Sequence, residues 1–325
     1  MAEAKRNIWQ KCRMMKRLDK IFVVTLLAVL AAMAVLPIAL NLRFIIFILT
    51  LTNIFAMLAV SWNLLSGYMG LLSLGHSFFF AGGGYAAAIL SISYGVPPVA
   101  AVFLGALVIT GLGSLIGLPS LKLRGHFFAL VTLIIPIIAY QVTNAIPQLG
   151  GHDGIFGIPS LFQSAEAFYL ASLAAMAGSV MVSYLVMRSR LGIIFTCIKD
   201  DEIAAKAAGI DVPRYKLLGL AISIFIAGVA GAFYAYLNGV ISPATYELEK
   251  ASLPLLMTLL GGRATILGPV VGAYIIEILI ETLKIEVLVR ARLLIYSALA
   301  LLIFMIFPSG IVGFLRRKVY GDTAG

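Results

Sequence analysis

The stretch RSRLGIIFTCIKDDEIAAKAAGIDVPRYK, residues 188–216, is a polar interruption in a chain that is strongly apolar on both sides of it. The charged residues in its middle are Lys199, Asp200, Asp201, Glu202 and Lys206. This pattern predicts a short amphipathic helix in a water-exposed loop between two membrane spans. Two interpretations are open: an ordinary solvated loop helix, or a surface on which a water-soluble partner docks.

Local signals predict where this loop helix begins and ends. Acidic residues in a first turn suit the positive end of a helix dipole, and Glu202 and Lys206 stand four apart in the order that favours an ion pair. Gly209 is expected to end the helix, and Pro213 to prevent its continuation. Ala205 and the neighbouring alanines leave a small face that a partner surface can approach closely.

Composition places the rest of the chain in a membrane. The 325 residues are 62% hydrophobic and 12% charged, with a mean hydropathy of +1.05, whereas soluble domains carry about a quarter charged residues. Continuous apolar runs favour helices over a barrel, and the length allows roughly eight to ten crossings. We therefore expect an all-α, polytopic membrane protein with broken or re-entrant glycine-rich elements.

Basic residues predict the domain organisation and the orientation. A basic segment at 1–20 precedes an apolar run at 21–40, which is long enough to span and lacks a clear cleavage site, so we expect an uncleaved first helix. Residues 21–315 form one expected transmembrane domain containing the 188–216 loop, and 316–325 form a basic tail. Both termini and the loop are expected in the cytoplasm. Since membrane orientation accounts for the net charge of +10, nucleic acid is not an expected partner.

Apolar runs predict the individual spans. They lie at 21–40, 44–65, 98–118, 127–146, 167–187 and 217–237, with further apolar runs at 251–262, 270–283 and 293–307. The run at 251–262 is too short for a full crossing, so we predict a half-helix or re-entrant element there. Glycines in 67–93 either break a helix or let helices approach closely. Trp62 and Trp9 are expected to be interface anchors at most.

The glycine-interrupted segments, one in each half of the chain, supply a second group of candidates. Freed backbone groups in such segments can line a passage, and paired segments raise the hypothesis of an internal duplication. The candidate passage residues are Ser73, Gly75, His76, Gly82, Gly261 and Gly262. His76 lies in a stretch without charged residues, so it must find a hydrogen-bond partner or stay neutral. A structural histidine bonded to a backbone carbonyl is the alternative.

The chain lacks the residue patterns of an enzyme. It has no Gly-x-x-x-x-Gly-Lys-Ser/Thr sequence to cradle nucleotide phosphates, and no convincing nucleophilic triad or carboxylate pair. Its histidines lie far apart in sequence, and Cys12 and Cys197 fall in segments expected in the cytoplasm, where disulfides are rare. We expect no catalytic residue, metal or cofactor in this chain.

Two carboxylates four residues apart, Glu277 and Glu281, keep an ion-coupled mechanism open. Buried carboxylates in membrane spans often mark ion or proton paths. A pairing of Glu277 with Arg263 is one hypothesis for this region. Glu281, near the expected external end of its helix, is predicted to reach water.

Several stretches resemble the LivM-type permease subunits of branched-chain amino acid importers, within the ABC transporter family. They are WNLLSGYMG (62–70), LSLGHSFF (72–79), GY (84–85), LKLRGHFFALVTL (121–133), GGHDGI (150–155), SRLG (189–192), residues 199–209, GGRATILGP (261–269) and FPSGIVG (307–313). In this order they cover about residues 20–315. The chain departs from the family at Arg263, where a small or apolar residue is usual, and at 193–197, which replace a more basic stretch.

The resemblance implies a permease subunit of an ATP-driven importer of branched-chain amino acids in the bacterial cytoplasmic (inner) membrane. It implies that the loop helix couples the chain to an ATPase through Lys199, Asp200, Asp201, Glu202, Ala205, Lys206 and Gly209. The implied partners are a LivH-like second permease subunit, two ABC ATPase subunits that bind ATP and Mg, and an extracytoplasmic substrate-binding protein. Alternatives are a permease for urea, short amides or other amino acids, an ion-coupled secondary transporter using Glu277, and a channel or scaffold.

Overall fold

A computed structural model describes residues 43–123, 125–282, 298 and 310–312. Residues from Phe47 onward belong to one compact unit, and of the preceding unit only 43–46 are described. The spans expected at 21–40 and 293–307, with both terminal segments, lie outside the described residues.

Helices make up nearly all of the described chain. In order, the helices and helical turns are α2 (Arg43–Trp62), η1 (Asn63–Tyr68, a π-helical turn), α3 (His76–Tyr94), α4 (Pro98–Gly117), η2 (Pro119–Lys122), α5 (His126–Ala145), η3 (Pro147–Leu149), α6 (Ala165–Arg188), α7 (Arg190–Asp200), α8 (Glu202–Ala207), α9 (Val212–Asn238), η4 (Pro243–Tyr246), α10 (Leu248–Gly261) and α11 (Gly268–Thr282). In the described part, six helices are long and apolar enough to cross a membrane, namely α2 with η1, α3, α4, α5, α6 and α9. The prediction of an all-α, polytopic membrane protein is confirmed.

The short apolar run after α9 forms a half-length helix, as predicted. α10 has 14 residues, about 21 Å at 1.5 Å per residue, which is shorter than a bilayer core of about 30 Å. A loop at 262–267 connects it to α11, and the two helices pack against each other. Gly272 permits this contact, since a Cβ there would lie 1.8 Å from the carbonyl oxygen of Met257.

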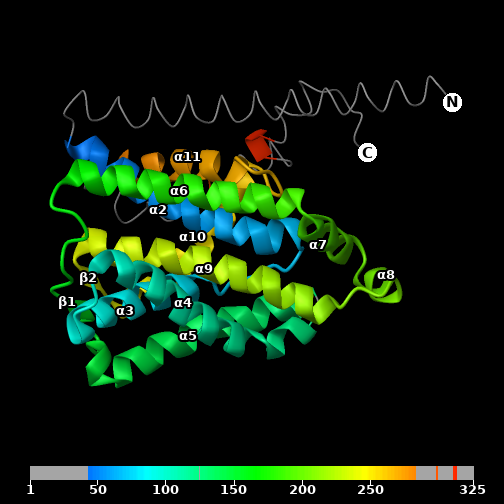
Figure 1. The fold of residues 1–325 in the computed structure, drawn as a ribbon, viewed down its shortest axis with the longest axis horizontal. Coiled ribbons are helices and arrows are strands. Elements are labelled where there is room, and N and C mark those ends of the chain that lie inside the picture. Colours follow the sequence, from blue (N-terminus) through cyan, green and yellow to red (C-terminus); the bar gives the residue numbers. More distant parts are fainter. Residues whose placement is uncertain (1–42, 124, 283–297, 299–309, 313–325) are drawn as a thin grey trace. The chain divides into compact units, whose positions relative to one another are not determined.

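The centre of the fold is the packing of α3 and α4 on α9 (Figure 1). Glycines let the α3 and α9 backbones touch: a Cβ on Gly231 would lie 1.7 Å from the carbonyl oxygen of Phe80, and one on Gly83 would lie 2.3 Å from that of Gly228. No other residue type fits at these distances. The close-approach alternative predicted for 67–93 is therefore confirmed at Gly83.

A two-stranded sheet and the helices α7 and α8 mark opposite ends of the long helices (Figure 1). β1 (Ile155–Phe156) pairs antiparallel with β2 (Val240–Ile241), which joins the α5–α6 connection to the α9–α10 connection. We call this end the β1–β2 end, and the other the α7–α8 end.

A buried hydrogen bond holds the turn between α2 and α3. Trp62 is buried, and its indole N–H donates to the carbonyl oxygen of Ser73 at 2.7 Å. The prediction that Trp62 is an interface anchor is wrong, because the broken backbone after η1 offers a buried acceptor that the indole satisfies.

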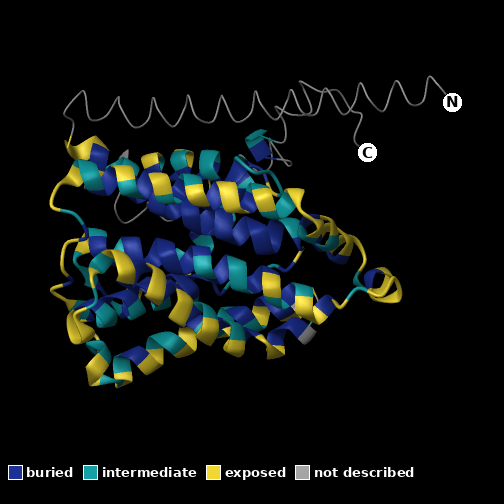
Figure 2. Cartoon of the chain, in the orientation of Figure 1, coloured by how far each residue is buried: buried dark blue, intermediate teal, exposed yellow. Residues whose placement is uncertain are grey.

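Burial is uneven among the helices that can cross a membrane. α2 and α9 are mostly buried, whereas α5 exposes most of its length (Figure 2). The largest contact of α5 is with the turn η4, and its contact with α3 is no larger than those with the adjoining turns η2 and η3. It is therefore the least enclosed of the long helices that the structure describes beyond residue 46.

Candidate functional site

The residues predicted to form one loop helix belong to two helices. Lys199 and Asp200 lie in the last turn of α7, and Asp201 then takes an extended conformation, with φ −155° and ψ 107°. Its carboxylate oxygen Oδ1 accepts the backbone N–H groups of Ile203 at 2.7 Å and Ala204 at 3.0 Å. The single-helix prediction is wrong, because a capping carboxylate competes with continuation of the helix.

Removing this cap is expected to loosen α8 without unfolding the chain. Asp201→Ala withdraws the acceptor of two N–H groups and should cost about 1 kcal/mol, so amide hydrogen exchange over 203–208 should accelerate roughly fivefold. Asp200→Ala is the matched control, since Asp200 is exposed at the carboxyl end of α7, where a helix dipole disfavours a carboxylate. Equal exchange rates in both variants would contradict the capping role.

The end of α8 follows the sequence signals. Gly209 has a φ of +83°, and its N–H donates to the carbonyl oxygen of Lys206 at 3.0 Å. The predicted stop at Gly209 is confirmed. Pro213 lies in the first turn of α9, where a fixed φ and a missing N–H are tolerated, and the Asp211 carboxylate caps that helix by accepting the N–H of Arg214 at 3.4 Å.

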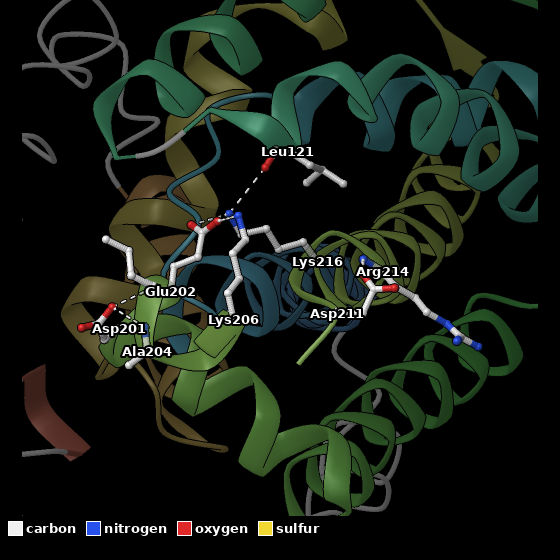
Figure 3. A network of polar contacts seen from close by, with 9 residues as sticks. Leu121, Asp201, Glu202, Ala204, Lys206, Asp211, Arg214 and Lys216 are labelled. Atoms are coloured by element: carbon white, nitrogen blue, oxygen red, sulfur yellow. Dashed lines mark hydrogen bonds and ion pairs between the residues drawn. The ribbon is translucent and has the colours of Figure 1, made fainter. Parts of the chain in front are cut away.

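A polar network joins α8 to the body of the protein, and Figure 3 shows the ammonium groups of Lys206 and Lys216 beside the Glu202 carboxylate. Glu202 Oε1 lies 3.5 Å from Lys206 Nζ, as the i,i+4 spacing predicts, and Oε2 accepts a hydrogen bond from Lys216 Nζ at 2.8 Å. Lys216 is 1% exposed, and its ammonium also reaches the carbonyl oxygen of Leu121 at 3.5 Å. We call these four residues, Glu202, Lys206, Lys216 and Leu121, the polar network. They connect α8, α9 and the turn before α5.

Sequence reasoning treated Lys216 only as a flanking charge and missed its place in this network. The signal available was its position: a single cation at the start of a long apolar run, one turn after the Asp211 cap. A lysine there must either reach solvent or find a partner. The structure shows the second outcome.

The outer face of α8 is small and apolar (Figure 2). Ile203 is 64% exposed, and Ala204, Ala207 and Ala208 are exposed beside it. Ala205, also a predicted coupling residue, is buried against the protein. An exposed isoleucine among alanines gives α8 a single apolar knob on a surface that another protein can approach closely.

The two glycine-interrupted segments meet where η1 faces the α10–α11 loop. The Asn63 amide nitrogen donates to the carbonyl oxygen of Thr265 at 2.9 Å, and its amide oxygen accepts the N–H of Ala264 at 2.9 Å. The Arg263 guanidinium donates to the carbonyl oxygen of Ser66 at 2.9 Å. We call these five residues the η1 junction. It supplies the partners that the broken backbone needs.

The carboxylates of α11 lie elsewhere. The hypothesis that Glu277 pairs with Arg263 is wrong, since Arg263 serves the η1 junction while Glu277 lines a separate cavity of about 160 Å³ with Glu281 and Lys250. Both glutamates are buried, so the expectation that Glu281 reaches water is also wrong. Within the described residues, this cluster does not form a group that could hold a metal ion.

The end of α7 packs against the segment that follows η1. A Cβ on Gly70 would lie 3.0 Å from the Lys199 Cγ. Burial lowers the pKa of Lys199 below its usual value, and the nearby Arg263 guanidinium acts in the same direction, while Asp200 opposes it. The end of α7 therefore packs beside η1 and the segment that follows it.

Among the candidate passage residues, His76 and Ser73 are fully buried where α3 begins. The His76 Nε2 lies 3.0 Å from Ser223 Oγ, and Nδ1 lies 3.1 Å from Ser73 Oγ. Because the Ser223 hydroxyl donates to the carbonyl oxygen of Ser61 at 2.8 Å, its oxygen accepts from Nε2–H in the neutral imidazole, and Nδ1 accepts from Ser73. Two hydroxyls hold the ring, and the backbone of Ser61 supplies a partner of the kind predicted. The Ser223 contact ties α3 to α9.

The four glycine candidates occupy close-packed positions. Gly75 precedes α3 and packs on the backbone of α5, and Gly261 packs on Gly268 across the α10–α11 hairpin. Gly262 ends α10 with a φ of +129°. Gly82 lines a cavity between α3, α4 and α5. Their role in a passage stays a prediction.

Comparisons with known proteins agree on one family. The family model described as the branched-chain amino acid transport system permease component matches residues 44–308. The high-affinity branched-chain amino acid transport system permease proteins LivM of Salmonella typhimurium and Escherichia coli are each 29% identical over 267 residues, which are 73% of this chain. The match spans only 63% of the length of these two relatives. The LivH permease protein of Escherichia coli is 25% identical over 81% of this chain and 92% of the relative. No solved structure matches the chain.

Proposed function

The chain belongs to the branched-chain amino acid transport permease family, and on this premise we propose that it is the LivM-like membrane subunit of an ATP-driven importer of branched-chain amino acids. The observation that carries the proposal is α8, a capped helix with an exposed apolar knob, joined to the protein by a buried ion pair. In this function the chain is a transporter component, and ATP is hydrolysed on separate subunits.

Two physical routes lead from α8 into the membrane helices. The first runs from Glu202 to Lys216 and on to Leu121, in the turn before α5. The second runs along α7 to its contact with η1 and Gly70. Closure of an ATPase dimer would move α8 and bias the packing of both elements, provided that nucleotide binds the two states with different affinity. A shift from 1:99 to 99:1 needs about 5.5 kcal/mol of differential binding.

The proposed assembly contains a LivH-like permease, two ATPase subunits that bind ATP and Mg, and an extracytoplasmic binding protein. Similarity of this chain to both LivM and LivH relatives supports a pair of related permeases. We place the α7–α8 end on the cytoplasmic side of the bacterial inner membrane and the β1–β2 end on the outer side. Arg188, Arg190 and Arg214 at the α7–α8 end support this orientation through the positive-inside rule.

A charge introduced on the α8 surface tests the docking directly. Ile203→Asp places a carboxylate at the centre of the proposed contact and should reduce the ATPase subunits that co-purify with the tagged chain roughly tenfold, as expected for a central interface residue. Ile203→Leu keeps the apolar knob and serves as control. Undiminished co-purification with Ile203→Asp would contradict docking at α8.

A second candidate function rests on the buried carboxylates of α11. An ion-coupled secondary transporter would use Glu277, whose cavity also holds Glu281 and Lys250. Solute uptake that persists without ATP and collapses in Glu277→Gln would favour this candidate. Uptake that depends strictly on ATP would support the importer.

A further inference from the structure

A small cavity of about 160 Å³ lies among α2, α9, α10 and α11. Two of its lining residues place it near the β1–β2 end: Asn238 ends α9 two residues before β2, and Glu249 stands in the first turn of α10. The lining belongs to the compact unit that begins at Phe47. A cavity of about 150 Å³ holds a molecule the size of benzene, so this one has room for a single small solute.

The Lys250 ammonium group is held in this cavity by aromatic rings. Its Nζ lies 5.2 Å from the centre of the Phe55 ring and 6.0 Å from that of Tyr234, and both rings line the cavity. Among the described residues, the Lys250 side chain makes no ion pair or hydrogen bond. Because Lys250 is only half-buried, a solute can reach it. A carboxylate that enters the cavity would therefore meet a cation that lacks an anionic partner in the described chain.

Acceptors for an ammonium group lie in the same cavity. The Glu249 carboxylate is half-buried. The exposed Asn238 side chain donates to the carbonyl oxygen of Tyr234 at 2.8 Å, which leaves its amide oxygen as an acceptor. Glu277 and Glu281 are buried in the wall, where any negative charge they carry favours a cation in the cavity.

Two larger cavities, of about 520 and 550 Å³, offer no such pair of charges. Their described linings contain no charged side chain, so neither could neutralise the two ends of an amino acid. The rest of the small cavity's wall is apolar and includes Phe47, Leu51, Leu253 and Ile280. The small cavity thus combines a cation, acceptors for a second cation and an apolar surface. A zwitterion with an aliphatic side chain needs all three.

We propose that this cavity is the site at which the transported amino acid enters the membrane subunit, with Lys250 donating to its carboxylate and Glu249 accepting from its ammonium group. The inference rests on the proposed function, which places the β1–β2 end on the outer side, and it assigns the substrate a site there. The small volume admits an aliphatic side chain more readily than a bulky aromatic one. Because the loop between α10 and α11 bonds η1, a shift of η1 would move two walls of the cavity.

Binding of leucine and leucinamide tests the site by saturation-transfer NMR. The full complex is purified through a tag on this chain, without its binding protein, and placed in lipid nanodiscs, with empty nanodiscs as background. Leucinamide keeps the side chain and the ammonium group but lacks the carboxylate. The wild-type complex should bind leucine about tenfold more tightly than leucinamide, because a hydrogen bond between charged groups is lost in the amide. Lys250→Met should remove this preference, whereas a structural defect would weaken both ligands equally.

A second variant tests the other end of the substrate. Glu249→Gln should weaken leucine binding several-fold but leave 4-methylpentanoate, which lacks the ammonium group, unchanged. Glu247→Gln is the matched control: the same change two residues away, at an exposed side chain outside the cavity, should leave leucine binding as in wild type.

The site and the function can fail separately. The site is overturned if wild-type complex gives no saturable leucine signal, if it binds leucine and leucinamide equally, or if the preference survives in Lys250→Met. ATP-driven leucine uptake by the same wild-type complex, supplied with its binding protein, would then leave the proposed function intact. A wild-type complex that takes up no branched-chain amino acid overturns the function, and the inference with it.

Discussion

Replacing Lys216 with methionine should lower ATP-driven uptake at least tenfold while the assembled complex continues to hydrolyse ATP. Lys216 is buried, and its ammonium lies 2.8 Å from Glu202 Oε2, closer than the 3.5 Å between Lys206 Nζ and Glu202 Oε1. Breaking a buried pair costs about 3–5 kcal/mol. The cost here should be nearer the lower limit, since the Glu202 side chain is 18% exposed and keeps Lys206. Methionine keeps the packing volume of the stem but releases α8 from α9 and from the turn before α5.

Lys206→Met is the matched control for this experiment. Lys206 contacts the same carboxylate, but its side chain is 48% exposed and the distance is 3.5 Å. An exposed pair of this kind contributes about 0–1 kcal/mol, so uptake should change less than about twofold. Uptake and hydrolysis are measured on the same proteoliposomes, which separates lost coupling from lost protein. Equal losses in the two variants would show that burial of the Lys216 pair has no special role.

Much of this fold could be predicted because the membrane imposes a simple rule on length and polarity. The spans expected at 98–118 and 127–146 appear as α4 and α5 within one residue at each end. The half-length run at 251–262 appears as α10, three residues longer at its start. These predictions depend only on where the apolar runs begin and end, and glycine and proline mark those positions.

The site was less predictable, because it depends on side-chain hydrogen bonds that local helix propensity does not predict. Residues 199–208 all favour or tolerate a helix, and only the Asp201 carboxylate, by capping α8, divides them. The bond from Lys216 to Glu202 crosses a turn, and the one from Asn63 to Thr265 joins residues 202 positions apart. In both cases the two partners do not share a helix, so the periodicity within one helix cannot reveal these contacts. A polar residue alone in an apolar run was the available signal for both.

The prediction with the largest effect on folding concerns the contact of α3 with α9. In Gly231→Ala, the new Cβ would lie 1.7 Å from the Phe80 carbonyl oxygen, so the two helices must separate by more than an ångström. Backbone cannot rotate away as a flexible side chain can, and overpacking of a dense core costs about 1–3 kcal/mol or more. Separation would also strain the Ser223 bond to His76, which joins the same two helices. We expect a large loss of monodisperse protein and a lower unfolding temperature in detergent.

Gly111→Ala is the control, because it adds the same methyl group to a helix without a steric clash. Gly111 lies in α4, and a Cβ there meets nothing within 4 Å. Alanine is the better helix former by about 1 kcal/mol, so this variant should be as stable as the parent or slightly more so. A loss of stability in Gly231→Ala together with unchanged or higher stability in Gly111→Ala would establish that α3 and α9 need backbone contact. A Gly231→Ala protein with parental stability would mean that these helices pack further apart than the structure has them.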